Sequence, residues 1–466
     1  MPPPSLASGD SLPRAQGRAG TLPRGASHRL LWLLTIAGCG AVLAAPAVWN
    51  GFPLLQYDTG GYLARWFEAT LVPSRPGAYG LLLAATGRVD FWPAVAAQTL
   101  ATIWVLALLL RAHGLGGAAR LAILIGALSA VSTLPWLTSI LLTDIFAGLA
   151  VLAMYLLVFR NDCLRAWERA ALMLLVGFAA ATHSATLVLL AGLAFAALAF
   201  QHFAQTHAPR GGARRAATAA ALGVVMTFAG NYAVTGRIAW TPGGVSLLFG
   251  RMLQDGIVDR YLDERCPDAT LRLCMYRKEL PRDADVWFWG DDLFDEMGRF
   301  AGLGDEMARI ATGSLRRYPL LQVKTALVAT ARQLVLVGSG EGVVNHIWHS
   351  YAIIDRYVPG AGAAMRAARQ QVTGIDFTAI NRLHVPVALV AMLLLPGLVW
   401  LGWRDERFAQ TGVLAAAVAV TLLANAAVCG ILSNPHDRYG ARVAWLAVLV
   451  IVMAALQAHA RRKENP

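Results

Sequence analysis

The sequence is poor in charged residues, which make up 15% of its 466 residues, whereas soluble globular proteins contain about 25%. Hydrophobic residues account for 57%, so lipid is a better solvent for much of this chain than water. The net charge is +12, but the Lys and Arg residues lie in short segments between apolar runs and not on one basic face with interleaved aromatics. This distribution argues against a nucleic-acid partner and favours a membrane protein.

Several sequence motifs are also missing. The chain has no Walker loop, no HExxH, no GxSxG and no GxGxxG in a strand context, so ATP-driven and zinc-dependent chemistry have no support, and we assign no cofactor and no metal. Only five cysteines are present. Cys266 and Cys274 lie eight residues apart in a polar segment, where they either form a local disulfide in an oxidising compartment or remain free thiols.

Ten apolar runs predict an all-α polytopic membrane protein with about ten transmembrane helices and a long outer-face segment. The first run ends in small residues that resemble a signal-peptide cleavage site. Because that run is long and its leader is longer than usual, we favour an uncleaved span. The runs cover residues 30–49, 91–110, 119–138, 141–159, 170–182, 184–203, 216–234, 384–402, 409–432 and 440–459.

Basic residues in the short connections predict the orientation, because Lys and Arg favour the cytoplasmic side of a membrane. With ten spans, the basic segments fall on one face and both termini are cytoplasmic, as in a multi-pass protein of an inner membrane. We interpret the chain as a disordered cytoplasmic tail, an N-terminal transmembrane bundle, an outer-face region, C-terminal transmembrane helices and a second cytoplasmic tail. These parts cover residues 1–28, 29–234, 235–383, 384–460 and 461–466, respectively.

The outer face receives the first loop, 50–90, and the region 235–383. Residues 235–318 hold half of the acidic residues and are expected to be solvated. The run 319–340 is apolar enough to cross the membrane, but a crossing would move the C-terminal basic residues outside. We therefore favour an amphipathic helix at the outer interface. The alternative is that it spans and is paired with another crossing within 341–380.

Two carboxylates stand at the ends of apolar runs. Asp58 follows the first span in the segment Tyr57-Asp58-Thr59-Gly60-Gly61, and Asp144 opens the run 141–159. A carboxylate at the membrane surface is partly desolvated, which suits a general base, and carboxylates in membranes are costly enough to suggest function. Either residue could instead cap a helix.

Several cationic and polar residues fall on the same predicted face. Arg75 lies between two prolines on a stiff backbone, and its planar guanidinium suits phosphate or carboxylate, although it could simply reach to lipid headgroups. His183 joins two apolar runs, where a lone histidine is often a satisfied core residue. The other candidate ligand-binding residues are Lys324, His436, Arg438 and Tyr439; the last three lie in a polar segment that could also be an ordinary charged loop.

In this order, the signals resemble the GT-C superfamily of integral-membrane glycosyltransferases, which includes protein O-mannosyltransferases and the enzymes that transfer aminoarabinose to lipid A. Tyr57-Asp58 resembles the acidic site after the first span, and Ser74-Arg75-Pro76 resembles the segment before the second. Thr143-Asp144 opens the fourth span, and Arg438-Tyr439 precedes a late one. The resemblance covers the first 200 residues best and the last 40 weakly, and it leaves 235–383 without a counterpart.

The resemblance implies an inverting transfer from a polyprenyl-phosphate-linked sugar to a glycan, lipid or protein acceptor at the outer face. Asp58 would be the general base, and Asp144 would position the acceptor or the partners of Asp58. Arg75 and Arg438, with His183 and Lys324, would stabilise the leaving phosphate. Because no second acidic residue lies two positions from Asp58, the metal-binding form of the family motif is absent.

Three other functions remain open from the sequence. A transporter or flippase of a lipid-linked or small solute would show inverted repeats with broken helices at the membrane midplane, which the chain lacks. A polysaccharide polymerase or ligase would use the same carrier and similar outer-loop residues. A non-catalytic envelope assembly protein would use 235–383 to bind a partner.

Overall fold

The computed structural model describes residues 26–71, 75–203, 211–346 and 348–462. The predicted N-terminal tail, 1–28, therefore lies outside the described residues up to residue 25, as do residues 463–466 of the C-terminal tail. The described chain is all-α: it contains helices and one isolated parallel bridge between Leu54 and Ile140, but no strand. The predicted all-α class is confirmed for these residues.

Seven described helices are long and apolar enough to cross a membrane. They are α1 (Ala26–Asn50), α4 (Trp92–Ala112), α9 (Ser184–Phe203), α10 (Gly212–Thr235), α20 (Thr378–Arg404), α21 (Ala409–Leu432) and α22 (Asp437–Arg462). Three further helices of the bundle are shorter, namely α5 (Ala118–Val131), α7 (Asp144–Phe159) and α8 (Ala166–Thr182). The chain is thus a polytopic, helical membrane protein by the length and composition of its helices.

Most predicted runs have somewhat different boundaries in the structure, and two of them show the physical reason. The run 119–138 is divided into α5 and α6 (Leu134–Ser139). Pro135 stands in the first turn of α6, where a proline is favoured because its missing N–H would have no helical partner there. The run 170–182 extends back to Ala166 as α8, where Glu168 accepts a hydrogen bond from the backbone N–H of Arg165 at 2.8 Å and so stabilises the first turn.

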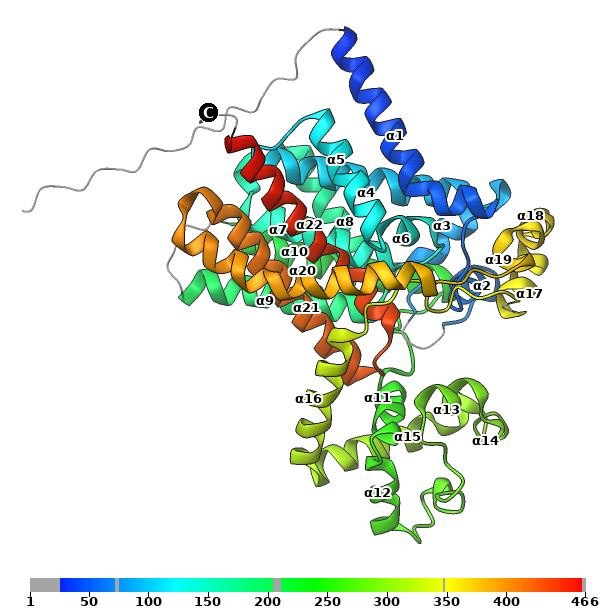
Figure 1. Ribbon diagram of the computed structural model, residues 1–466. Helices are drawn as coiled ribbons and strands as arrows, with labels where there is room; N and C mark the ends of the chain where they lie inside the picture. The colour runs from blue at the N-terminus through cyan, green and yellow to red at the C-terminus, as the bar shows by residue number, and fades with distance from the viewer. Residues whose placement is uncertain (1–25, 72–74, 204–210, 347, 463–466) are drawn as a thin grey trace, which may run out of the picture.

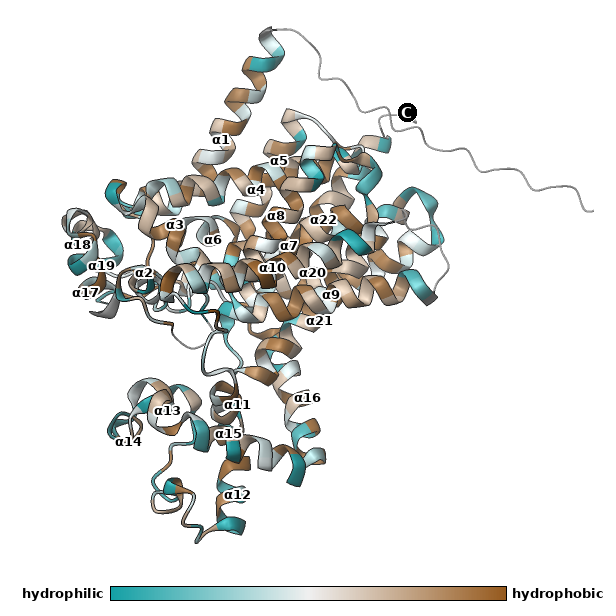
Figure 2. Cartoon of the chain, turned by 180° about the vertical axis from the view of Figure 1, so that it is seen from behind, coloured by the Kyte–Doolittle hydropathy of each residue, from teal (hydrophilic) through white to brown (hydrophobic). Residues whose placement is uncertain are grey.

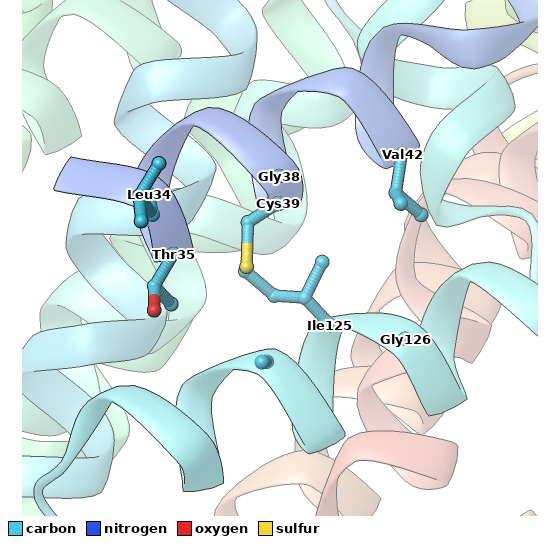
Figure 3. Close-up of a pocket in the computed structure, with 8 residues that line it drawn as sticks. Leu34, Thr35, Gly38, Cys39, Val42, Ile125 and Gly126 are labelled. Carbon is cyan, nitrogen blue, oxygen red and sulfur yellow. The ribbon is translucent and has the colours of Figure 1, made fainter. Parts of the chain in front are cut away.

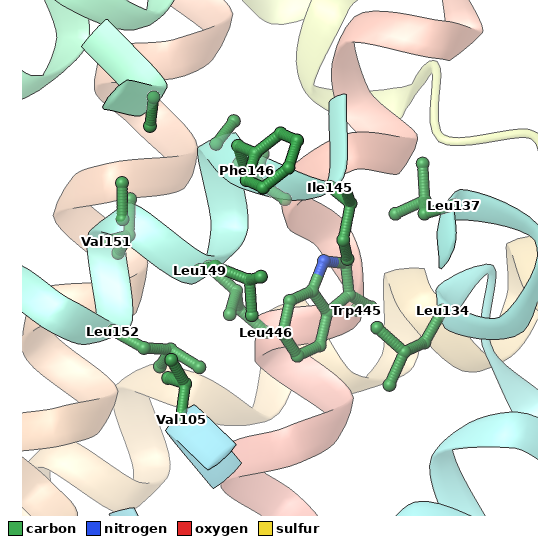
Figure 4. Close-up of a cluster of buried hydrophobic side chains, with 14 of the residues drawn as sticks. Val105, Leu134, Leu137, Ile145, Phe146, Leu149, Val151, Leu152, Trp445 and Leu446 are labelled. Atoms are coloured by element: carbon green, nitrogen blue, oxygen red, sulfur yellow. The ribbon is translucent and has the colours of Figure 1, made fainter. Parts of the chain in front are cut away.

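The hydrophobic core of the bundle surrounds α7, which is buried from Asp144 to Val158. Figure 4 shows Ile145, Leu149 and Leu446 packed around the indole of Trp445. The approach of α22 to α7 depends on Gly148, where a Cβ would lie 2.7 Å from the Trp445 ring. The first half and the last helix of the chain therefore form one core.

Basic turns gather at one end of the bundle. Arg111 in the last turn of α4 forms a salt bridge with Glu168 at 2.6 Å, and Arg160 after α7 donates to the carbonyl of Ala112. At the C-terminal end of α22, Arg461 donates to the carbonyl of Arg407 at 2.9 Å. The basic segments that the sequence places on the cytoplasmic face thus form at least two contacting pairs. The described ends of α1 and α22 lie on the same, upper side of the molecule (Figure 1).

A separate unit with its own core projects away from the chain ends (Figure 1). Its buried centre includes Phe249, Trp287 and Phe294, and a disulfide joins Cys266 to Cys274, which settles the alternative left open by the sequence. It consists of α11 (Gly244–Gln254), α12 (Ile257–Arg265), α13 (Ala284–Gly290), α14 (Asp292–Glu296) and α15 (Arg299–Arg317). Hydrophilic residues are frequent on this α11–α15 unit, in contrast to the bundle (Figure 2).

The helix α16 (Pro319–Val335) connects this unit to the bundle and packs against α21. Only Ala329 and Gln333 are buried along it, and its exposed side chains include Leu320, Leu327 and Val328. An exposed apolar face fits the predicted interfacial helix within 319–340, whose membrane placement stays a prediction. The remaining helices are α2 (Thr59–Glu68), α3 (Ala78–Thr86), α17 (Trp348–Tyr357), α18 (Gly362–Ala367) and α19 (Arg369–Val372).

Candidate active site

Arg438 bridges two carboxylates that lie far apart in the sequence. Its Nη1 donates to Asp58 Oδ2 at 2.7 Å, and its Nε donates to Asp144 Oδ2 at 2.8 Å. The other oxygen of Asp58 pairs with Arg75. These four residues, here called the carboxylate–arginine network, have side chains no more than 19% exposed. Charge-assisted hydrogen bonds of this kind are strong, and Arg438 can make two at once because its guanidinium is planar.

The two aspartates do not serve as helix caps in the way that the alternative interpretation requires. Asp58 stands at the N-cap of α2, but its side chain makes no capping hydrogen bond and turns to Arg75 and Arg438 instead. Asp144 is the first residue of α7. The segment just before it is fixed to the loop that contains Leu54, because the Leu141 N–H donates to the Leu54 carbonyl at 2.9 Å. The loop after α1 and the start of α7 are therefore tied together beside the network.

A glycine-rich turn supplies a carboxylate that the sequence analysis missed. Glu341 accepts a hydrogen bond from the backbone N–H of Arg438 at 2.7 Å, and its other oxygen contacts His436 Nδ1 at 2.7 Å. The turn needs Gly340 and Gly342, whose φ angles are +88° and +77°, in the left-handed region that favours glycine. The spacing Gly-Ser-Gly-Glu-Gly was the signal available in the sequence. Glu341 fixes the backbone from which Arg438 projects.

His436 connects the network to the α11–α15 unit. Its Nε2 lies 3.2 Å from Asp285 on α13, and Asn434 donates to the same carboxylate at 3.1 Å. Burial disfavours the imidazolium, but the hydrogen bonds that it donates to Asp285 and Glu341, with the charges of these carboxylates, outweigh burial and raise the pKa of His436 to about 10. The histidine is therefore charged at neutral pH and holds the two acidic side chains together.

Asp58 is strongly biased towards its ionised form. Burial alone would raise the pKa of its carboxyl, but the charges of Arg75 and Arg438 and the hydrogen bond from Arg438 outweigh burial and hold the pKa well below its ordinary range. As long as both guanidinium groups stay in contact, Asp58 is a carboxylate with little tendency to take up a proton.

Several polar atoms around the network are buried without a hydrogen-bond partner in the described chain. They are the free Oδ1 of Asp144, Nη2 of Arg438, Nδ1 of His183 and all three side-chain nitrogens of Arg65. Buried polar groups are normally paired, so each unpaired one calls for an explanation. A gathering of them at one place is expected of a site that receives a polar ligand.

The other predicted site residues divide into two groups. His183 is buried between α8 and α9 and is close enough to interact electrostatically with Asp58. The guanidinium carbon of Arg438 lies over the ring of Tyr439, 5.7 Å from the ring centre. Lys324 does not join them. It is exposed on α16, nine residues before Gln333, which binds the backbone of His436. Nine residues of helix span about 13 Å, so Lys324 lies apart from the network.

Two arginines near the network were also missed from sequence. Arg442 is fully buried one turn after Arg438, where its Nη2 donates to Asn425 at 2.8 Å. Arg65 is 1% exposed on α2 and, among the residues that the structure describes, makes no hydrogen bond through its side chain. Both stand within regular apolar or amphipathic helices, so nothing in their neighbours marks them. Together with Arg75 and Arg438 they place four guanidinium groups around two carboxylates.

A cavity of about 380 Å³ lies elsewhere, between α1 and α5 (Figure 3). Its lining is apolar apart from Thr35 and Cys39, and it contains none of the network residues. Among the described residues, no group of three His, Cys, Asp or Glu side chains is placed to hold a metal ion. No protein-family model, curated protein or solved structure matches the chain.

Proposed function

We propose that the protein is a membrane glycosyltransferase that moves a sugar from a polyprenyl-phosphate donor to an acceptor hydroxyl at the outer face of an inner membrane. The carboxylate–arginine network carries this proposal. It combines a candidate base with anion-binding groups, and it lies at the end of the bundle away from the contacting basic turns. A lipid-linked donor accounts for placing such a site on a helical membrane bundle.

Donor binding would activate the base. When a phosphate oxygen takes a hydrogen bond from Arg75 or Arg438, it competes with Asp58 for that guanidinium. The pKa of Asp58 then rises towards the ordinary range, because the groups that depress it are shared. Nη2 of Arg438 and the three side-chain nitrogens of Arg65 have no hydrogen-bond partner among the described residues. They can donate to the phosphate without breaking an existing contact.

The chemical step is a displacement at the anomeric carbon. Asp58 accepts the proton of the acceptor hydroxyl as its oxygen forms a bond to that carbon. The bond between the anomeric carbon and the phosphate oxygen breaks, and its electron pair leaves with the polyprenyl phosphate. Arg75 and Arg438 stabilise the charge that develops there, and the configuration inverts. Asp144 acts as a positioning residue, since its Oδ2 holds Arg438 Nε at 2.8 Å.

The test compares Asp58→Asn and Asp144→Asn in a transfer assay with a polyprenyl-phosphate sugar in detergent or liposomes. Asp305→Asn on the exposed surface of α15 is the matched control. We expect Asp58→Asn to lose transfer by roughly 10²-fold or more. Asp144→Asn should lose less, because the amide can still accept from Arg438. Full activity of folded Asp58→Asn would remove the base and with it the proposed mechanism.

A further inference from the structure

Arg65 carries a buried charge whose hydrogen-bond donors are unused among the described residues. It lies on α2, it is 1% exposed, and Nε, Nη1 and Nη2 are all buried without a hydrogen-bond partner. Burying an unpaired guanidinium costs roughly several kcal/mol of folding free energy. Packing alone does not normally justify such a cost. Burial lowers the pKa of Arg65 to about 10, so the group is still protonated at neutral pH.

The guanidinium of Arg65 does not stand alone in space. A Cβ built on Gly61 would lie 3.6 Å from Arg65 Nη2 and 3.9 Å from Arg75 Nη1. The two cationic groups therefore approach the same point, and the absence of a side chain at Gly61 leaves that point open. Arg75 uses Nη2 for Asp58, so Nη1 is directed to this second location.

Several hydrogen-bond donors around this location are unused among the described residues. Asp58 and Asp144 form their ion pairs with Arg75 and Arg438. Arg65 interacts electrostatically with Asp58 and Glu68, but none of its three side-chain nitrogens donates a hydrogen bond. A ligand with oxyanion character would complete the arrangement, because a guanidinium presents donors in the geometry that phosphate accepts.

We propose that Arg65 and Arg75 form an oxyanion subsite above Gly61 that binds a phosphoryl group of the substrate. The inference rests on the proposed transferase only for the identity of that substrate. The phosphoryl group belongs either to the lipid donor or to a phosphorylated acceptor, two sources with the same recognition chemistry. Arg65 would bind it through the nitrogens that have no protein partner.

The binding test uses the purified full-length protein in detergent with inorganic pyrophosphate and inorganic phosphate as probes. A ligand that binds the folded state raises the melting temperature according to its affinity and concentration. We expect pyrophosphate to stabilise the unmodified protein. Arg65→Met should weaken this binding roughly tenfold or more, the loss expected for a charged hydrogen bond. Arg65→Met should also melt no lower than the parent without ligand, because an uncompensated buried charge is removed.

Gly61→Ala provides a second variant that does not depend on tolerating a change at Arg65. Its methyl group would meet the two arginines at ordinary contact distance, and alanine favours the helix, so the protein should fold. The methyl would nevertheless occupy the open point and weaken pyrophosphate binding. Gly192→Ala in α9 is the matched control, since nothing lies within 4 Å of a Cβ there. Parent-like binding in both Arg65→Met and Gly61→Ala would overturn the subsite, and so would the absence of any stabilisation of the parent.

Transfer kinetics then separate the two sources and the two proposals. A rise in KM for the donor in Gly61→Ala assigns the phosphoryl group to the lipid carrier, and a rise in KM for the acceptor assigns it to the acceptor. Arg65-dependent pyrophosphate binding in a protein whose Asp58→Asn variant still transfers would refute the transferase mechanism and leave the subsite standing. Loss of transfer in Asp58→Asn with parent-like binding in both Arg65→Met and Gly61→Ala would support the transferase mechanism and refute the subsite.

Discussion

Replacing Arg438 by lysine tests whether the network depends on one planar group that contacts two carboxylates. The parent makes two charge-assisted hydrogen bonds, at 2.7 Å to Asp58 and 2.8 Å to Asp144. A compact ammonium keeps the charge but cannot reproduce the fork, so we expect one of the two contacts to be lost. A hydrogen bond to a charged group contributes about 1.5–3 kcal/mol, which is the predicted destabilisation of Arg438→Lys.

The effect on transfer should be larger than the effect on folding. If Arg438 stabilises the leaving phosphate, misplacing its donors costs roughly 10²–10³ in rate, the range found when one preorganised donor is removed. Thermal unfolding in detergent and transfer from a polyprenyl-phosphate donor measure the two effects on the same preparation. Arg316→Lys on the exposed last turn of α15 is the control. Parent-like stability and parent-like transfer in Arg438→Lys would falsify the two-carboxylate bridge.

Three more substitutions test other parts of the structure. The raised pKa of His436 contributes stability that is fully present below about pH 6.5 and is lost as pH approaches about 10. His436→Gln should therefore flatten the fall in melting temperature between neutral pH and pH 10, and an unchanged profile would argue against the charged histidine. Cys274→Ser opens a short loop and should destabilise the α11–α15 unit by about 2–3 kcal/mol, seen as faster proteolysis there; parent-like resistance would contradict this. Gly148→Ala forces a methyl against Trp445 and should cost about 1–3 kcal/mol in a melting experiment, whereas an unaffected midpoint would show that α22 can shift.

The helical membrane character was predictable because long apolar runs leave few alternatives for a backbone in lipid. Boundaries were less predictable where one residue decides them, as at Pro135, where the run 119–138 divides into α5 and α6. Asp58, Arg75, Asp144 and Arg438 could be singled out from sequence because polar residues at the ends of apolar runs are conspicuous. The contact of all four side chains in one network is stronger evidence for a functional site than any one of these residues taken alone.

The parts that were missed share a physical reason. Glu341 acts through a turn whose shape depends on backbone angles at Gly340 and Gly342, and single-residue patterns do not reveal which groups such a turn brings together. Arg65 occupies an ordinary position on a short amphipathic helix, and its lack of a partner is a property of three-dimensional packing. Lys324 shows the opposite error: the sequence predicted that this lysine binds the ligand, but the structure places it on α16, apart from the network.

The distance along the chain between Asp144 and Arg438 has a consequence for biosynthesis. Their hydrogen bond spans 294 residues, so the carboxylate at the start of α7 enters the membrane long before its partner exists. At roughly 5–20 residues per second, synthesis of the intervening chain takes about 15–60 s. Until α22 is made, Asp144 lacks the one cation that pairs with it among the described residues, so a chain truncated before α22 leaves this carboxylate uncompensated.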